Sequence, residues 1–176
     1  MKNLIRVAVG LFVLLITGMG SSASAAGPYM MMRVVPGPYG DCRIIDHKGW
    51  INVLAFRQEM TNPTSSTPDF GPFIVNKLLD KASVPLAYEL ATGRIFTQVI
   101  IDYGYVVEGH FQLEYQVVLE QARITYIAPE VSQQGDGEVV CFESYDPASS
   151  AVTWTYNTYN SAGGLTGTIT KTVPWN

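Results

Sequence analysis

Residues 110–127 constrain the fold more than any other part of the sequence, because apolar residues occupy every second position in the first half of this segment. These alternating positions are Phe111, Leu113, Tyr115, Val117 and Leu119. Such a pattern predicts a β-strand with one buried face. At about 3.3 Å per residue the segment would extend roughly 60 Å, which is too long for a flat strand in a small domain. We therefore expect the strand to bend or wrap, as strands do in a closed or nearly closed barrel.

The alternation changes phase in the middle of this segment. After Glu120 and Gln121 the apolar positions become Ala122, Ile124 and Tyr126, so one residue has been inserted into the pattern. Because the side chains of a strand alternate between two faces, an inserted residue must be accommodated locally if the same face is to stay buried. The sequence therefore predicts a β-bulge near Glu120 and Gln121.

Strand patterns also dominate most of the remaining chain. Further strands are predicted at residues 29–35, 50–60, 138–145, 152–156 and 165–173. Segment 50–60 carries apolar residues on both faces, which predicts a strand buried on each side. Clusters of turn-forming residues separate the strands, as at residues 36–40 and in the polar loop 61–69. The fold class is therefore mainly β, with about seven or eight strands.

One segment, residues 83–93, has the pattern of an α-helix. Ser83 can cap the first turn, Pro85 is tolerated within that turn, and Gly93 suits the left-handed position after the last turn. The apolar stripe consists of Leu86, Ala87 and Leu90. A short helix with so narrow a stripe is not stable alone, so we expect it to pack on the sheet and cover one end of the barrel.

The first residues have the composition of a secretory signal peptide. Lys2 and Arg6 give a positive start, residues 7–16 are almost entirely apolar, and residues 23–25 are small, as at a cleavage site. The apolar run is shorter than the ~20 residues that a membrane-spanning helix needs. We predict a signal peptide over residues 1–25 and a folded β-barrel domain over residues 26–176. The mature protein is then secreted or periplasmic, with no membrane attachment.

Export would place Cys42 and Cys141 in an oxidising compartment, where two thiols can form a bridge. We therefore predict a Cys42–Cys141 disulfide. Such a bridge closes a long loop and would stabilise the fold by roughly 2–4 kcal/mol. The prediction requires the two positions to be adjacent in the fold, and the sequence alone leaves that adjacency open.

The composition excludes several classes of function. The chain of 176 residues is 47% hydrophobic, which is enough to build the core of a single domain and argues against general disorder. Its formal net charge is −4, and its Lys and Arg residues form no basic patch. Non-specific nucleic-acid binding needs such a patch, so we expect no nucleic-acid partner.

The residues that usually carry chemistry do not form a convincing site. Asp41, Cys42, Asp46 and His47 cluster locally, but their spacing matches no structural zinc motif, and His110 lies far away in the sequence. The chain also lacks a G-x-S-x-G nucleophile motif. We therefore predict no catalytic residues, no metal site and no cofactor, and so no enzyme.

Acidic residues in two strand segments allow a weaker catalytic hypothesis. The pairs Glu114 with Glu120 and Asp102 with Glu108 have the residue types that glycoside hydrolysis uses. Charges that alternate along strands more often belong to a solvated face, which is the interpretation we favour. Segment 102–109 contains two glycines but no phosphate-binding motif, and its pattern is typical of a hairpin connection.

Two further patterns suggest binding rather than catalysis. Aromatic side chains that can stack on sugars are Trp50, Trp154, Tyr156, Tyr159 and Trp175, although cores and subunit interfaces use the same residue types. Threonines share one face of segment 165–173, which also suits an ordinary solvent-facing strand. We favour the core, interface and solvent-facing interpretations over a binding array.

The order of several segments carries a family resemblance. These segments are residues 51–56 (INVLAF), residues 73–83, the short helix ending at Thr92-Gly93-Arg94, the long strand 111–127, residues 138–142 (EVVCF) and residues 152–156 (VTWTY). Together they resemble the haemolysin-coregulated protein (Hcp) family, the tube subunits of type VI secretion systems. The resemblance covers most of the predicted mature domain, although the family's tube subunits carry no signal peptide.

The resemblance implies a β-barrel of two packed sheets flanked by one short helix. It also implies a structural protein without catalytic residues, which assembles as a hexameric ring and acts as a tube subunit or as a carrier of secreted effector proteins. The expected partners are therefore copies of the same chain and effector proteins. The alternative is a monomeric secreted β domain that binds a carbohydrate or a cell-surface partner through exposed aromatic side chains.

Overall fold

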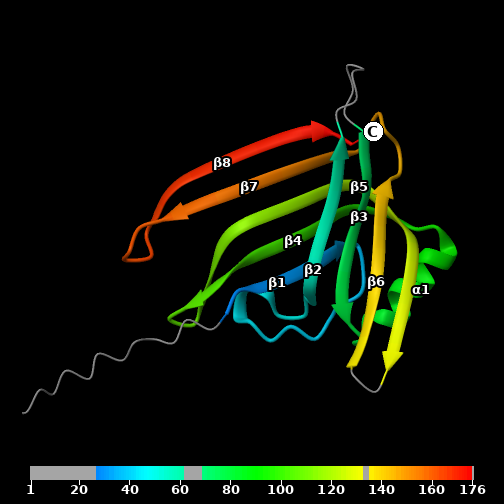
Figure 1. Cartoon of the computed structure of the whole chain (residues 1–176), viewed down its shortest axis with the longest axis horizontal. Helices are drawn as coiled ribbons and strands as arrows, with labels where there is room; N and C mark the ends of the chain where they lie inside the picture. The colour runs from blue at the N-terminus through cyan, green and yellow to red at the C-terminus, as the bar shows by residue number, and fades with distance from the viewer. Residues whose placement is uncertain (1–26, 62–68, 133–134, 176) are drawn as a thin grey trace, which may run out of the picture.

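The computed structural model describes residues 27–61, 69–132 and 135–175 (Figure 1). The strands are β1 Tyr29–Val35, β2 Ile51–Thr61, β3 Asp69–Leu78, β4 Ile95–Val107, β5 His110–Ser132, β6 Gly135–Ser144, β7 Ala151–Tyr159 and β8 Leu165–Pro174. The helices are α1 Ser83–Thr92 and the short 3-10 helix Ile45–His47. The mainly β class is confirmed. The predicted signal peptide, and loop residues 62–68, lie outside the described residues.

The strands form one antiparallel sheet that closes on itself. Its order is β4-β1-β2-β3-β6-β5-β7-β8, and an additional pairing of β4 with β5 completes a circuit that leaves β7 and β8 outside the closed part. Figure 1 shows two groups of strands at a steep angle: β1, β4, β7, β8 and the start of β5 in one group, and β2, β3, β6 and the end of β5 in the other. This arrangement confirms the predicted barrel of two packed layers.

The phase change in β5 is confirmed at Gln121. Val117 and Leu119 are buried before it, and Ala122 and Ile124 are buried after it, so the buried face moves by one position. Gln121 adopts a left-handed backbone conformation with φ 51°. Its carbonyl oxygen accepts hydrogen bonds from the Tyr145 N–H at 2.9 Å and the Ser150 hydroxyl at 3.0 Å. These bonds hold the backbone at the point where the pattern shifts.

The sequence pattern was wrong about the residues that follow. Strand β5 stays in register with β4 from Glu120 to Ala122, so the predicted bulge does not lie at Glu120 and Gln121. The register shift of β5 against β6 lies instead between Ile124 and Tyr126. Tyr126 is consequently 54% exposed, whereas the next residue, Ile127, packs against the core. The alternation alone did not reveal this shift, because it depends on how β6 pairs with β5.

The core fills the closed part of the barrel. Its largest buried side chains are Met32, Ile51, Phe73, Leu86, Phe96, Ile101, Leu119, Phe142 and Trp175. The prediction that β2 is buried on both faces is wrong. Ile51 and Val53 are buried on one face, whereas Leu54 on the other face is 55% exposed and Ala55 is exposed. The fully buried residues of β2 therefore lie at its start, and further along the strand only Phe56 packs against the core.

The predicted helix is confirmed, with two corrections. It ends at Thr92, and Gly93 takes the left-handed conformation with φ 65°. Leu86 is fully buried and Leu90 packs against the core, but Ala87 is exposed. Ser83 does not cap the first turn: the N-cap is Ala82, which has no side-chain cap. No helix in the described part of the chain has the length and apolar character needed to cross a membrane.

The Ser83 hydroxyl instead belongs to a buried charged cluster around Lys77. The Lys77 side chain is completely buried, and its Nζ donates to Glu138 Oε1 at 2.6 Å and Asp80 Oδ1 at 2.8 Å. It also donates to Ser83 Oγ at 3.1 Å and to the Leu78 carbonyl oxygen at 2.7 Å. The cluster joins β3, β6 and the start of α1. All the protons of the ammonium group are satisfied, which compensates the cost of burying the charge.

Removal of one member of this cluster tests its importance. We expect Lys77→Met to lower the free energy of unfolding by about 3 kcal/mol, because the Glu138 carboxylate is left buried and unpaired. Urea unfolding of the purified domain measures the change. In the double variant Lys77→Met with Glu138→Leu, much of the loss should be recovered. Lys81→Met is the matched control, since the Lys81–Asp41 pair is more than half exposed, at 58% and 53%. An equal loss in both single variants would contradict the prediction.

Candidate functional site

The hairpin of β7 and β8 extends the sheet beyond the closed barrel. Strand β8 ends the strand order, so its outer edge pairs with no other strand in the described part of the chain. Most of its residues are exposed, including Leu165 at 59% and Ile169 at 62%. An open edge with exposed apolar residues is a surface suited to pairing with another chain.

One face of this hairpin is a ladder of hydroxyl groups. Thr153 and Thr172 are hydrogen-bonded across the two strands at 2.8 Å, and Thr155 and Thr170 at 3.2 Å. Further along, the Thr168 hydroxyl donates to Asn157 Oδ1 at 2.7 Å. The threonines therefore bond within the hairpin, which fits the interpretation of a solvent-facing strand better than that of a binding array.

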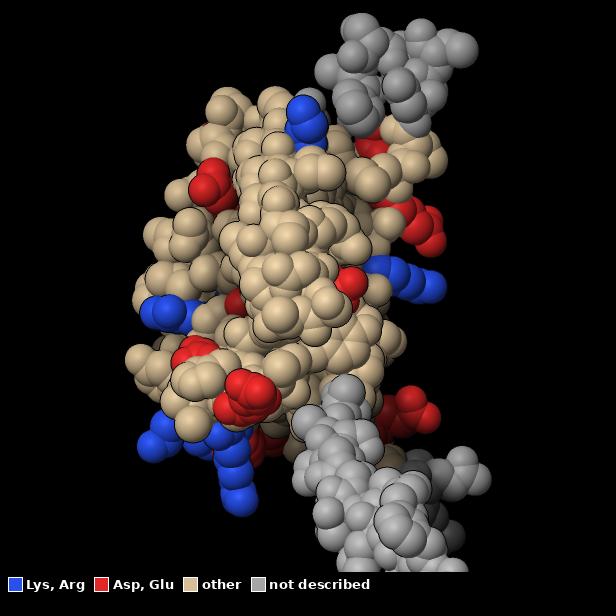
Figure 2. All heavy atoms as spheres, turned by 90° about the vertical axis from the view of Figure 1, so that its left-hand side faces the viewer, with Lys and Arg blue, Asp and Glu red and all other residues tan. Residues whose placement is uncertain are grey.

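The opposite face of the hairpin continues the core outward. Val152 is buried, and Trp154 packs against the core with its ring stacked on Phe70 at a centroid distance of 6.4 Å. Tyr156 follows on the same face and is 43% exposed. Figure 2 faces the end of the molecule where the β4–β5 and β7–β8 turns lie, and this surface is largely uncharged, with charged side chains toward its margins.

The aromatic residues considered for sugar stacking do not form one surface. Trp175 is 1% exposed and belongs to the core with the half-buried Trp154. Trp50 contacts the His47 ring, at a centroid distance of 4.4 Å. Only Tyr156 and Tyr159 lie together, at a pocket beside β7. The core interpretation is thus confirmed for two of the tryptophans.

The local cluster of possible metal ligands separates in the structure. His47 Nε2 lies 2.7 Å from Asp102 Oδ2, Asp46 accepts the Phe111 N–H at 3.2 Å, and Asp41 pairs with Lys81 at 3.2 Å. No group of three or more His, Cys, Asp or Glu side chains suited to a metal is present within residues 27–61, 69–132 and 135–175. The sequence cluster therefore reflects three separate contacts.

The contact between His47 and Asp102 was not predicted. His47 is 6% exposed and Asp102 is 5% exposed, so the expectation that Asp102 lies on a solvated face is wrong. The His47 ring lies edge-on to Trp50 and to Phe111, each at 4.4 Å between centroids. Asp102 Oδ1 also accepts a hydrogen bond from Gln116 Nε2 at 2.8 Å. These contacts fasten the segment before β2 to β4 and β5.

The other acidic residues considered for hydrolysis lie in unlike surroundings. Glu108 is exposed and lies in the β4–β5 turn, where its backbone φ is 52°. This turn consists of residues 108–109, and the rest of the predicted hairpin connection, residues 102–107, belongs to β4. Glu120 is half-buried and pairs with Ala151. Glu114 is half-buried at the pocket beside β7. Asp102 is engaged by His47 and Gln116, whereas Glu108, with which it was paired in the hypothesis, is exposed in the turn.

Both cysteines are free thiols in the structure. Cys42 donates its N–H to the Trp50 carbonyl oxygen just before β2, whereas Cys141 lies in β6 opposite Ile74 of β3. Ile74 in turn pairs with Arg57, several residues further along β2 than Trp50. Burial raises the pKa of both thiols. The Cys42–Cys141 bridge is therefore not formed in this arrangement and stays a prediction from the sequence.

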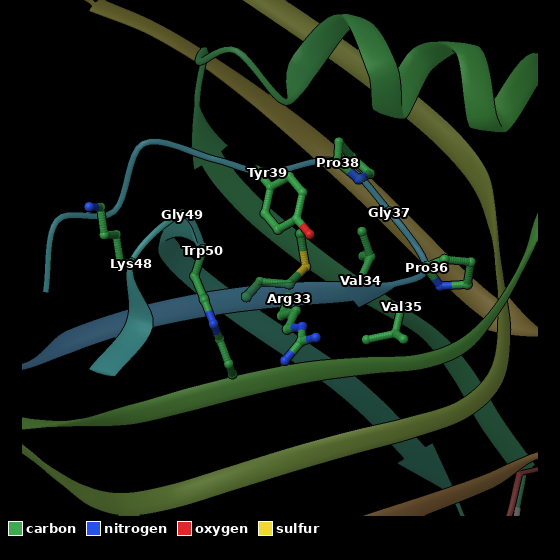
Figure 3. Close-up of a pocket in the computed structure, with 11 residues that line it drawn as sticks. Arg33, Val34, Val35, Pro36, Gly37, Pro38, Tyr39, Lys48, Gly49 and Trp50 are labelled. Carbon is green, nitrogen blue, oxygen red and sulfur yellow. The ribbon is translucent and has the colours of Figure 1, made fainter. Parts of the chain in front are cut away.

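A pocket of about 510 Å³ lies between β1, the turn after it and the segment before β2 (Figure 3). Arg33 and Lys48 line it and form no ion pair with another described residue. In Figure 3 the Arg33 and Trp50 side chains extend to one side of β1, while Tyr39 lies on the other side. The pocket therefore has a cationic rim but no set of polar groups that converge on one point.

A comparison of the sequence with models of protein families gives one match. The family model described as "Type VI secretion system effector, Hcp" matches residues 29–160, which span β1 to the end of β7. The chain belongs to the Hcp family. Strand β8 lies beyond the matched residues. No curated protein matches the chain.

Solved structures of Hcp proteins share the fold. The chain is similar to Hcp1 from Salmonella typhimurium, with a TM-score of 0.68 and 19% identity over 85% of this chain and 96% of that chain. It is similar to the secreted protein Hcp3 from Pseudomonas aeruginosa, with a TM-score of 0.61 and 22% identity over 85% and 97%. A type VI secretion system effector from Yersinia pestis gives 0.67 and 18% over 82% and 98%.

The His47–Asp102 contact can be tested by removing its carboxylate. We expect Asp102→Ala to lower the free energy of unfolding by about 2 kcal/mol, because His47 and Gln116 each lose a hydrogen-bond partner in a buried place. Thermal and urea unfolding measure the effect. Asp46→Ala is the control, since its exposed carboxylate accepts only the 3.2 Å bond from Phe111. Equal stability of the unaltered protein and Asp102→Ala would show that the contact does not support the fold.

Proposed function

We propose that this protein is a tube subunit of a type VI secretion system. Six copies of the chain would assemble into a ring, and the ring could carry effector proteins. The observation that supports this most is the Hcp family match over residues 29–160. The fold similarity to Hcp structures agrees with it. A structural role also fits the described residues, whose candidate catalytic groups lie in separate contacts. The alternative of a monomeric glycan-binding domain is not favoured, because Trp154 packs against the core.

Ring closure requires two different surfaces on each subunit. We propose that the open edge of β8 is one of them. The second is β2, because β1 pairs with it only at Ile51 and Asn52. From Val53 onward the outer edge of β2 has no partner strand in the described part of the chain, and Leu54 and Met60 are each 55% exposed there. Two unlike open edges are suited to head-to-tail pairing of neighbouring subunits.

Native mass spectrometry of residues 26–176 tests the ring and the role of β8. We expect a hexamer for the unaltered protein and mainly monomers for Ile169→Glu, because the new carboxylate would be desolvated at the contact. Val84→Glu is the matched control, since Val84 is 79% exposed on α1 and we expect that variant to stay hexameric. A monomer of the unaltered protein over the whole micromolar range would refute the ring. A hexameric Ile169→Glu would instead exclude β8 from the contact.

Export by a signal peptide also remains part of the proposal. If the protein is processed after residue 25, the N-terminus recovered from expressing bacteria starts at Ala26, and the intact mass is lower by that of residues 1–25. Non-reducing peptide mapping of the same material tests the proposed bridge between Cys42 and Cys141. Peptides carrying free Cys42 and free Cys141 would exclude the bridge, and an unprocessed N-terminus would exclude signal-peptide cleavage.

A further inference from the structure

A second pocket, of about 320 Å³, opens where β5 and β7 separate. Their pairing ends at Tyr115 opposite Tyr156. Beyond that pair, residues 112–114 and 157–159 diverge, and Tyr105 of β4 completes the lining. One side of the gap is fixed, because the Leu113 carbonyl oxygen accepts hydrogen bonds from Asn157 Nδ2 at 2.9 Å and from the Tyr159 hydroxyl at 2.7 Å.

Three side chains that line this pocket already use hydrogen-bond donors within the protein. Asn157 and Tyr159 both donate to Leu113, and Gln112 Nε2 donates to the Gly163 carbonyl oxygen at 3.2 Å. The Asn157 side-chain oxygen is also taken, since it accepts from Thr168. A ligand that needs donors from the protein, such as an anion, finds few of them here.

Glu114, by contrast, places a negatively charged carboxylate at this pocket. It forms no ion pair with another described residue, and its Oε2 is buried without a hydrogen-bond partner. The pocket lining contains no Lys, Arg or His. A partly buried carboxylate without a partner is costly, and a cation beside it would reduce that cost.

Several tyrosines lie around Glu114. The pKa of Tyr103 is raised to about 12, first by its hydrogen bond with Tyr105, then by burial and the charges of Tyr105 and Glu114. Tyr105, Tyr156 and Tyr159 line the pocket with aromatic rings. Aromatic faces attract cations, most strongly where water is partly excluded.

We propose that this pocket binds a cationic side chain, the guanidinium or ammonium group of an arginine or lysine on a partner polypeptide. Glu114 supplies the charge, and the tyrosine rings supply apolar and cation–π contacts. The volume suits one long side chain rather than a larger ligand. The inference goes beyond ring assembly and does not depend on it.

The test uses N-acetyl-arginine amide as the probe and the matched citrulline compound as a neutral isostere. We expect saturable shifts of the ring resonances of Tyr105, Tyr156 and Tyr159 in NMR titrations with the arginine probe. The citrulline compound should bind at least about tenfold more weakly, since it lacks the charge that Glu114 attracts, a difference of about 1.4 kcal/mol. Glu114→Gln should weaken the arginine probe by a similar factor while keeping the shape of the side chain.

Glu130→Gln is the control variant, because it removes one carboxylate from an exposed position of the same strand. We expect it to bind the arginine probe as the unaltered protein does. Equal affinity for the arginine and citrulline probes, or equal affinity in Glu114→Gln and Glu130→Gln, would overturn the proposal. So would the absence of saturation. The NMR spectrum of each variant reports whether it is folded, so a loss of binding through misfolding is recognised directly.

Discussion

The structure depends on how one long strand, β5, is shared among three neighbours. It pairs with β4 along its first half, with β7 over residues 115–120 and with β6 over residues 122–132. The left-handed Gln121 lies at the point where β7 gives way to β6. Because the buried face also shifts there, the first half of β5 belongs to one layer of the barrel and the second half to the other. Closure of the barrel therefore rests on a local change within a single strand.

Two buried polar contacts hold other parts of the chain to this barrel. Lys77 joins β3 to β6 and to the start of α1, and His47 joins the segment before β2 to Asp102 in β4. Buried ion pairs add little net stability relative to apolar packing, but a missing partner is costly. The Lys77 and His47 contacts therefore make it costly for α1 or for the segment before β2 to pack in another place, because a buried polar group would then lose its partner. Apolar contacts are less specific, so they penalise such alternative arrangements less.

The sequence predicted six of the eight strands, the helix and the shift of the buried face at Gln121, because each depends on a local pattern, but it did not predict β3 and β4 as strands. It did not predict the burial of Asp102 and Lys77, whose partners are 55 and 61 residues away along the chain. It also misplaced Tyr126, Leu54 and the hydroxyl of Ser83, since their surroundings depend on strand register and not on periodicity. The pocket at Glu114 arises in the same way: the carboxylate was visible in the sequence, but the separation of β5 from β7 was not.

The open edges of the sheet give assembly a physical basis. A closed barrel has no free edge. In the described part of the chain, however, β7 and β8 extend the sheet from β5 so that the outer edge of β8 has no partner strand, and β2 extends past its short pairing with β1. Unpaired edges with exposed apolar residues favour association, and proteins that remain monomeric usually block them with charges or prolines. The exposed Leu165 and Ile169 lie in the first part of β8, residues 165–170, which contains no charge and no proline; Lys171 and Pro174 follow only toward the end of the strand. In the proposed assembly the two edges differ, so pairing one with the other would leave an open edge at each end of a dimer, and closure into a ring would remove both.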